Sequence, residues 1–261
     1  TLGRGASDTT AVAVAAVLGA EMCEIYTDVD GIYTADPRKV PDARKIDHIS
    51  YMEMLELASL GARVMHNRSI MCAMNHKVPV HVRSSFTDTP GTMITEETPM
   101  MEDIAVTGCT AARNLARVIL VNVPHKPGMA GRIFGTIAAK NIIVDDIVQS
   151  AYRESGADVT FTCSMDDLNA VKVALEEMRE EAGFEKVVVD ENVAKVSVVG
   201  VGMRAHSGVA DKMFNALAAA GINIEMITTS EIKISTVLHV NDVENALRVV
   251  HDAFELGTPA A

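Results

Sequence analysis

The sequence predicts an α/β protein in which a parallel-sheet portion is followed by two α+β units of βαββαβ, ferredoxin-like order. One observation is the strand–helix–strand spacing of "SYMEMLELASLGARVMHNRSIMCAMNHKVPVHVRSSF", which is typical of a parallel sheet covered by helices. The other is an internal repeat: "GMAGRIFGTIAAKNIIVDDIVQS", from Gly128, recurs as "GVADKMFNALAAAGINIEMITTS", from Gly208. The repeat indicates two copies of one supersecondary unit.

The composition argues against several classes of protein. The 261 residues are enough for about two or three domains, and a net charge of −12 without a basic stripe argues against nucleic acid or an anionic membrane as a partner. No apolar run reaches the roughly 18 residues of a membrane helix, and no signal-peptide pattern opens the chain, so we expect a cytoplasmic protein. The scattered cysteines and histidines predict no metal site.

The first element is a glycine loop that leads into a helix. Gly3, Gly5 and the cluster from Ser7 to Thr10 precede an Ala/Val-rich run, which predicts a helix over 7–18. A capped helix N-terminus after glycines favours an anion such as a phosphate or a carboxylate. An ordinary βα turn, with a glycine and a capping serine, has the same pattern.

A buried strand over 23–26 comes next, and polar residues follow it. Thr27-Asp28-Val29-Asp30-Gly31 forms a turn at the carboxyl end of this strand, and Asp36-Pro37-Arg38 forms a second turn. Ligands of open α/β sheets bind at the carboxyl ends of strands, so these residues could hold a ribose, a base and phosphates. An ordinary Asp-Gly turn is the alternative.

The rest of the first portion is a helix pair and a strand. Ser50 and Glu53 predict a capping box that starts one helix, and Gly61 is expected to end it. A second helix is predicted from His66 or Asn67 to about Asn75, and a strand over 79–84. The stretch 87–103, with Pro90, Gly91 and Pro99, is typical of a connector.

Four ordered motifs give this portion a family resemblance. The stretches "TLGRGASDTTA", "YTDVDGIYTADPR", "ELASLGARVMHNRS" and "VPVHVRSSF…PGTMI" resemble the aspartate kinases of the amino-acid kinase superfamily. The resemblance makes residues 1–98 the C-terminal part of a catalytic domain. It puts the family's N-terminal glycine-rich segment upstream of Thr1, so we expect no kinase activity from this chain alone. The alternative is a non-catalytic, amino-acid-binding regulatory fragment or subunit.

The resemblance implies phosphoryl transfer from ATP to the β-carboxylate of L-aspartate, the first step of lysine, threonine and methionine biosynthesis. Mg²⁺ would be bound through the ATP phosphates. Arg63 replaces the family's usual lysine, Ala6 a glycine and Asn67 a frequent proline. The implied roles are catalysis for Asp8 and Arg63; substrate binding for Arg4, Gly5, Ser7 and Asp8; and nucleotide binding for Thr27, Asp28, Tyr33, Asp36, Arg38 and Arg63.

The two repeats predict one missing strand. The second repeat ends after its last helix, "VENALRVVHDAF", without a closing strand, whereas an unmatched strand is predicted over 103–111. We expect this strand to complete the second repeat's sheet, so that the first repeat (112–190) is inserted in the second (191–261). The elements of the first repeat are predicted as strands over 117–123, 142–151, 158–163 and 187–189 and helices over 129–140 and 167–181; the second repeat begins with a strand over 195–201 and ends with a helix over 243–254.

The βαββαβ repeats resemble paired ACT domains, the amino-acid-sensing modules of aspartate kinases. The resemblance implies feedback regulation by lysine, threonine or both, and a homodimer formed through these domains. Alternatively, the same turns are ordinary βα turns in a structural module. The implied effector contacts are Lys126, Gly128, Met129, Ala130, Asp145, Gln149, Asn223, Ile224, Ser230 and Glu231.

Overall fold

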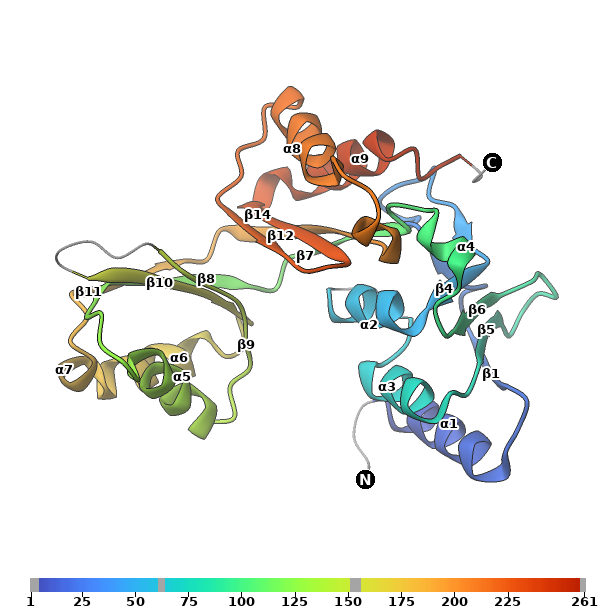
Figure 1. Cartoon of the computed structure of the whole chain (residues 1–261), viewed down its shortest axis with the longest axis horizontal. Helices are drawn as coiled ribbons and strands as arrows, with labels where there is room; N and C mark the ends of the chain where they lie inside the picture. Colours follow the sequence, from blue (N-terminus) through green and yellow to red (C-terminus); the bar gives the residue numbers. More distant parts are fainter. Residues whose placement is uncertain (1–4, 61–63, 151–155, 259–261) are drawn as a thin grey trace. The chain divides into compact units, whose positions relative to one another are not determined.

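A computed structural model describes residues 5–60, 64–150 and 156–258 (Figure 1). The chain forms two compact units, each treated separately below. Unit 1 comprises Thr1–Ala111, Val196–Thr236 and Asn241–Ala261, and unit 2 comprises Ala112–Lys195 and Val237–Val240. In the described part of the chain, no helix is long and apolar enough to cross a membrane.

The N-terminal portion of unit 1 is a four-stranded sheet covered by three helices. The strand order is β1-β5-β6-β4, and β1 pairs with β5 and β4 with β6 in parallel, as expected. The pair β5–β6 is antiparallel, because the short chain between them cannot make the crossover that parallel strands need. The elements are α1 (Ala6–Leu18), β1 (Cys23–Thr27), β2 (Ile32–Tyr33), β3 (Lys45–Ile46), β4 (His48–Ser50), α2 (Tyr51–Ser59), α3 (Asn67–His76), β5 (Val80–Ser84), β6 (Thr92–Thr95) and α4 (Pro99–Glu102).

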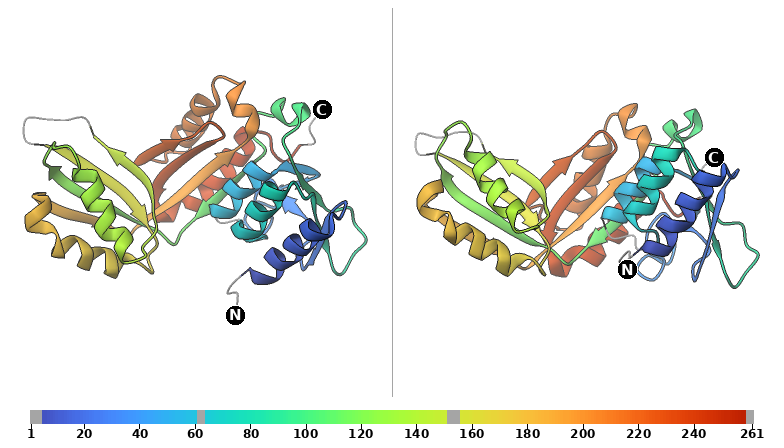
Figure 2. Two further views of the ribbon diagram at one scale, coloured as in Figure 1. Left: turned by 60° about the horizontal axis from the view of Figure 1, so that its bottom comes forward. Right: turned by 90° about the horizontal axis from the view of Figure 1, so that it is seen from below.

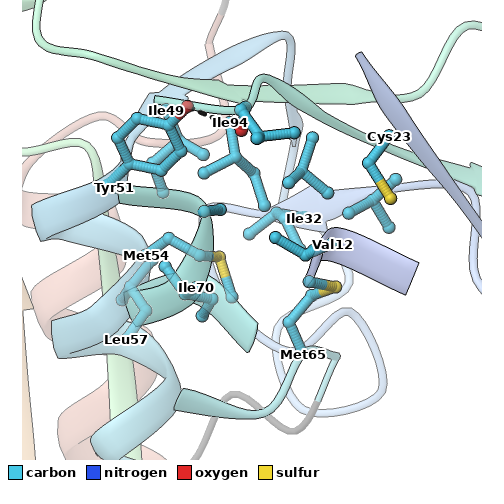
Figure 3. Packing of buried hydrophobic residues seen from close by; sticks show 14 of the residues in the cluster. Val12, Cys23, Ile32, Ile49, Tyr51, Met54, Leu57, Met65, Ile70 and Ile94 are labelled. Atoms are coloured by element: carbon cyan, nitrogen blue, oxygen red, sulfur yellow. Dashed lines mark hydrogen bonds between the residues drawn. The ribbon is translucent and has the colours of Figure 1, made fainter. Parts of the chain in front are cut away.

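An apolar core holds these helices on the sheet (Figure 3). Val12 of α1, Met54 of α2 and Ile70 of α3 are fully buried and converge on Ile49 and Ile94 of the sheet. Each such side chain contributes about 1.5–3 kcal/mol when it is fully buried. This packing holds the N-termini of the helices in place. Ser7 and Asp8 lie at the N-terminus of α1, and Ser50 lies at that of α2.

The predicted helix starts are partly corrected. The capping box of α2 is confirmed: Ser50 N donates to Glu53 Oε2 at 3.0 Å, and Glu53 N donates to Ser50 Oγ at 3.2 Å. Helix α1, however, begins at Ala6 instead of Ser7, and its N-cap is Gly5, with φ 73°. Ser7 lies inside the first turn, where its hydroxyl donates to Asp8 at 3.3 Å, so it cannot cap the helix. Gly61, the expected end of α2, is outside the described residues.

Unit 2 is a four-stranded sheet with its helices on one face (Figures 1 and 2). The strand order is β11-β8-β10-β9, and Phe134 and Phe161 meet edge to face with ring centroids 5.6 Å apart in the core. The single helix predicted over 167–181 is two helices, because Met178 (φ −100°, ψ 0°) leaves helical geometry between them. The elements are β8 (Ala116–Val123), α5 (Met129–Ala139), β9 (Val144–Gln149), β10 (Ala157–Cys163), α6 (Leu168–Glu177), α7 (Arg179–Ala182) and β11 (Lys186–Asp190).

The third sheet has the strand order β13-β14-β12-β7, and α8 packs against α9. Strand β7 begins at Gly108, five residues later than predicted, because the chain at 104–105 packs against two glycines. A Cβ at Gly202 would lie 2.3 Å from Ile104 O, and one at Gly200 would lie 2.4 Å from Ala105 O. The elements are β7 (Gly108–Ala112), β12 (Val193–Val199), η1 (Val201–Arg204), α8 (Val209–Ala219), β13 (Met226–Thr229), β14 (Lys233–His239), η2 (Val240–Asp242) and α9 (Val243–Ala253).

Candidate functional site

The N-terminus of α1 packs closely against the start of α3. A Cβ added at Gly5 would lie 2.3 Å from His66 Cγ, so only glycine lets the two segments approach this closely. Thr9 Oγ1 donates to Gly5 O at 2.8 Å, and among the described residues no side chain caps the helix. Backbone N–H groups at such a helix start favour an anion. Arg4 lies outside the described residues, and nothing in the sequence spacing pairs His66 with Gly5.

Asp8 lies in the first turn of the same helix, and its charge affects the thiol of Cys23 in β1. Burial raises the pKa of the Cys23 thiol, and the charge of Asp8 raises it further. The thiol therefore stays protonated, as expected for a buried apolar cysteine. The Asp8 carboxylate belongs to the same end of α1 as Gly5 and Ser7, so the described part of the predicted substrate site is contiguous.

The residues after β1 form a local hydrogen-bonded cluster. Thr27 Oγ1 donates to Asp28 Oδ1 at 3.1 Å, and the Tyr33 hydroxyl donates to Asp30 Oδ1 at 2.9 Å. Burial and the Asp30 carboxylate raise the pKa of Tyr33, so its hydroxyl remains a neutral donor and acceptor at pH 7. The cluster offers hydroxyl and carboxylate groups of the kind that bind a ribose.

A cation stands at the next turn, beside an aspartate. Arg38 Nε donates to Asp36 Oδ1 at 2.9 Å and Arg38 Nη2 donates to Oδ2 at 3.0 Å. The guanidinium lowers the pKa of Asp36, and the carboxylate raises that of Arg38, so both groups are charged at neutral pH. The Arg38 side chain is 87% exposed, so it can exchange Asp36 for a phosphate at little cost. Arg63, the other predicted phosphate ligand, lies outside the described residues.

In unit 2 the predicted effector turn is an open helix start. Gly128 is the N-cap of α5 with φ 89°, and a Cβ added there would meet nothing within 4 Å. Lys126 N donates to Pro124 O, and Met129 N donates to Lys126 O, so the turn is held by backbone bonds. Met129 and Ala130 form the first turn of α5. This turn can present N–H groups to a carboxylate.

Asp145 already binds an ammonium group, that of Lys195. Lys195 Nζ donates to Asp145 Oδ2 and to Asp146 Oδ2, both at 2.6 Å. Consecutive strand residues normally point to opposite faces, but Asp146 has φ 49° and the β9–β10 register shifts here, which brings both carboxylates to one side. Burial lowers the pKa of Lys195, but the two carboxylates outweigh burial, so its pKa lies above its usual value. No pattern in the sequence predicts this contact between Lys195 and the two aspartates.

The remaining predicted effector residues are divided between the two units. Gln149 ends β9 of unit 2, opposite Val159 of β10. In unit 1, Ser230 N donates to Lys233 O at 2.8 Å, and Glu231 forms an ion pair with Arg204 at 3.4 Å. Asn223 and Ile224 come just before β13.

An apolar hollow of about 400 Å³ lies along the exposed face of α1. It is lined by side chains that include Ala13, Val14 and Val17, and it contains none of the predicted ligand-binding residues. Val14 and Val17 of this face are exposed apolar side chains. Within the described ranges, no three His, Cys, Asp or Glu residues gather as a metal site.

Comparison with known families agrees with this architecture. Residues 1–84 match the Amino acid kinase family, and residues 117–183 and 196–254 each match an ACT domain. The class of protein is therefore a chain that joins an amino acid kinase portion to two ACT domains.

Individual relatives narrow this class. The chain is 49% identical to an aspartate kinase of Pseudomonas putida over 261 residues, which are 100% of this chain and 64% of that protein. It resembles the solved E. coli aspartokinase III in complex with aspartate and ADP (31% identity, TM-score 0.82, 97% of this chain and 56% of that chain). It also resembles the regulatory subunit of aspartate kinase from Thermus thermophilus (39% identity, TM-score 0.55, 57% of this chain and 99% of that chain). The chain belongs to the aspartate kinase family, and it spans 64% of the length of the P. putida relative.

Proposed function

We propose that this chain serves the aspartate kinase reaction, in which a phosphoryl group passes from ATP to the β-carboxylate of L-aspartate. The observation that carries the proposal is the 49% identity to an aspartate kinase along the whole chain. The E. coli relative was solved with aspartate and ADP, and its structure resembles 97% of this chain. The acceptor carboxylate is ionised at pH 7, so the reaction needs positioning and cations rather than a general base.

The nucleotide is proposed to bind along the segment that follows β1. Thr27, Asp28 and Tyr33 supply the hydroxyl and carboxylate groups for the ribose and base, and the exposed Arg38 reaches the phosphates from Asp36. Mg²⁺, bound through the ATP phosphates, would neutralise their charge. No cluster of protein carboxylates is required for that mode of binding. Arg63 is proposed as the second phosphate-directed cation, because its guanidinium is always charged.

The start of α1 is proposed to hold the acceptor side of the reaction. Its uncapped N–H groups and Arg4 would face anionic groups of aspartate, while Ser7 and Asp8 line the site. Asp8 is proposed to be the polar group nearest the transferred phosphoryl. The tight contact of Gly5 with His66 would fix the helix start in that position.

The ACT domains are proposed to bind lysine, threonine or both as feedback effectors. The open turn at Gly128 would take an effector carboxylate, and Asp145 or Glu231 an ammonium. The E. coli relative was also solved with lysine and aspartate. Strands β9 and β13 are edge strands of their sheets, and an edge strand can pair with a strand of another copy, which supports a homo-oligomer. We propose a cytoplasmic protein with domains at 1–98, 112–190 and 191–261, the last completed by the strand predicted over 103–111.

A second candidate is an amino-acid-binding regulatory subunit without catalysis. It is favoured by one observation: the regulatory subunit from Thermus thermophilus is matched over 99% of its length. Nucleotide binding separates the two candidates, because only the kinase function requires the segment after β1 to bind ATP.

The test is an NMR titration of the 261-residue chain with Mg²⁺ and a non-hydrolysable ATP analogue. We expect saturable shifts of the amide signals of residues 27–38 and of the first turn of α1. Gly5→Ala should weaken the affinity by about tenfold, because its Cβ would push the helix start away from His66.

Gly19→Ala is the matched control for that variant. Gly19 also has positive φ, 61°, at the other end of α1, but a Cβ there meets nothing within 4 Å. It should destabilise the chain by about 1–2 kcal/mol and leave the affinity unchanged. If no signal of residues 27–38 responds to the nucleotide, the regulatory-subunit candidate replaces the kinase function.

A further inference from the structure

Helix α9, which ends the second ACT domain, contacts the segment proposed to bind the nucleotide. His251 of α9 is fully buried, and its Nε2 lies 3.0 Å from Thr34 Oγ1. Thr34 directly follows Tyr33 and precedes Asp36 by two residues. These residues all belong to unit 1.

Every polar group of Thr34 is used, by Arg44, by Cys109 of β7 and by His251 of α9. Thr34 N donates to Arg44 O at 2.8 Å, Arg44 N donates to Thr34 Oγ1 at 2.9 Å, and Cys109 N donates to Thr34 O at 2.7 Å. Oγ1 accepts from Arg44 N and still has one lone pair and its own hydrogen, so it can bond His251 Nε2 in either tautomer of a neutral imidazole.

The surroundings of His251 favour that neutral form. Burial lowers the pKa of His251, although the nearby carboxylates of Asp252 and Asp42 partly offset this effect. Nδ1 is buried, and among the described residues it has no hydrogen-bond partner; Asp252 Oδ1 lies 3.8 Å away. With Nδ1 unsatisfied by the described residues, the contact of Nε2 with Thr34 is the hydrogen bond that holds the buried imidazole in place.

A second side chain of α9, that of Arg248, is hydrogen-bonded to the same segment. Arg248 Nε donates to Lys39 O at 2.9 Å, one turn before His251 and on the same side of the helix. Beyond the helix, a Cβ added at Gly257 would lie 2.9 Å from Asp42 O. Helix α9 and the residues after it therefore contact the chain at 34, 39 and 42, on both sides of Asp36 and Arg38.

We propose that His251 and Arg248 are positioning residues for nucleotide binding. They hold the segment from Tyr33 to Arg44 in place, and that segment contacts the nucleotide. The inference rests on the proposed nucleotide site. It means that a helix of a regulatory domain sets the geometry of Tyr33, Asp36 and Arg38. Nucleotide affinity should therefore depend on α9 even though α9 supplies no group to the nucleotide.

The test compares four variants of the 261-residue chain by two readouts. The first is amide hydrogen exchange over residues 33–44 without nucleotide, and the second is affinity for Mg²⁺ and a non-hydrolysable ATP analogue. His251→Leu keeps the bulk and removes the hydrogen bond, whereas His251→Gln places an amide near the position of Nε2. Arg248→Ala changes an exposed side chain and should leave folding intact, and Asn245→Ala, exposed on the same helix, is the control.

We expect His251→Leu and Arg248→Ala each to speed exchange at Thr34 and Arg44, and to weaken nucleotide affinity by about tenfold. His251→Gln should restore most of the exchange protection and most of the nucleotide affinity. Asn245→Ala should change neither the exchange rates nor the affinity. Unchanged exchange, or faster exchange with unchanged affinity, would overturn the inference, as would failure of His251→Gln to recover the affinity. If the unaltered chain does not bind the nucleotide at all, the proposed function fails, while the exchange data still decide whether α9 holds the segment.

Discussion

Lys195→Met is expected to destabilise unit 2 by about 3–5 kcal/mol, the loss typical of breaking a buried ion pair from one side. The Asp146 side chain is only 3% exposed, and Lys195 Nζ lies 2.6 Å from its carboxylate and from that of Asp145. Methionine fills the space of the lysine stem but removes the ammonium that the buried Asp146 carboxylate binds. Urea denaturation followed on unit 2 signals measures the loss.

Lys172→Met is the matched control for this prediction. Lys172 also pairs with a carboxylate, Glu191, at 2.9 Å, but both side chains are exposed (44% and 48%). Exposed pairs are worth about 0–1 kcal/mol, so this variant should lose no more than that. Because the pKa of Lys195 is raised, its contribution is complete below the unfolded value and is lost only as the pH rises through the folded value. Equal losses for Lys195→Met and Lys172→Met at pH 7 would contradict the buried pair.

Glu53→Ala is expected to cost unit 1 about 3–5 kcal/mol, because several buried donors lose their acceptor together. Glu53 is fully buried. Its Oε2 accepts from Ser50 N and Oγ, and its Oε1 accepts from Thr107 Oγ1 at 2.6 Å and from Val201 N at 3.0 Å. One carboxylate thus joins the start of α2 to Thr107, just before β7, and to Val201 at the start of η1.

The control is Glu56→Ala, one turn further along α2. Glu56 forms an ion pair with Lys233 at 3.1 Å and is 25% exposed, so its loss should cost about 1 kcal/mol. Thermal unfolding of the two variants, with hydrogen exchange at Val201 N as a local readout, measures the difference. If Glu53→Ala is no less stable than Glu56→Ala, the four-donor carboxylate does not hold these segments together.

The sequence predicted what depends on local pattern. The capping box at Ser50 and Glu53 was visible at a spacing of three residues, and the repeat from Gly128 to Gly208 predicted the order of strands and helices in both ACT domains, apart from the break at Met178. The α/β class and the family resemblance are confirmed. These features need only neighbouring residues or a repeated pattern.

The sequence could not predict contacts between distant residues or unusual backbone angles. The approach of Gly5 to His66, and the bond between Thr34 and His251, join residues far apart in the chain. The paired carboxylates on Lys195 depend on the positive φ of Asp146, a conformation that an aspartate rarely adopts. The N-cap at Gly5 was missed because serine, present at Ser7, is by type a better capping residue than glycine. The assigned ligand-binding roles stay predictions.

Calorimetric titration of the 261-residue chain with lysine, with threonine and with both together tests amino-acid sensing most directly. A regulated member of the aspartate kinase family should show saturable heat with at least one of these titrants. An effector that contacts the Gly128 turn should also shift the amide signals of Met129 and Ala130. No heat with either amino acid, alone or together, would contradict the assignment of these ACT domains as its lysine and threonine sensors.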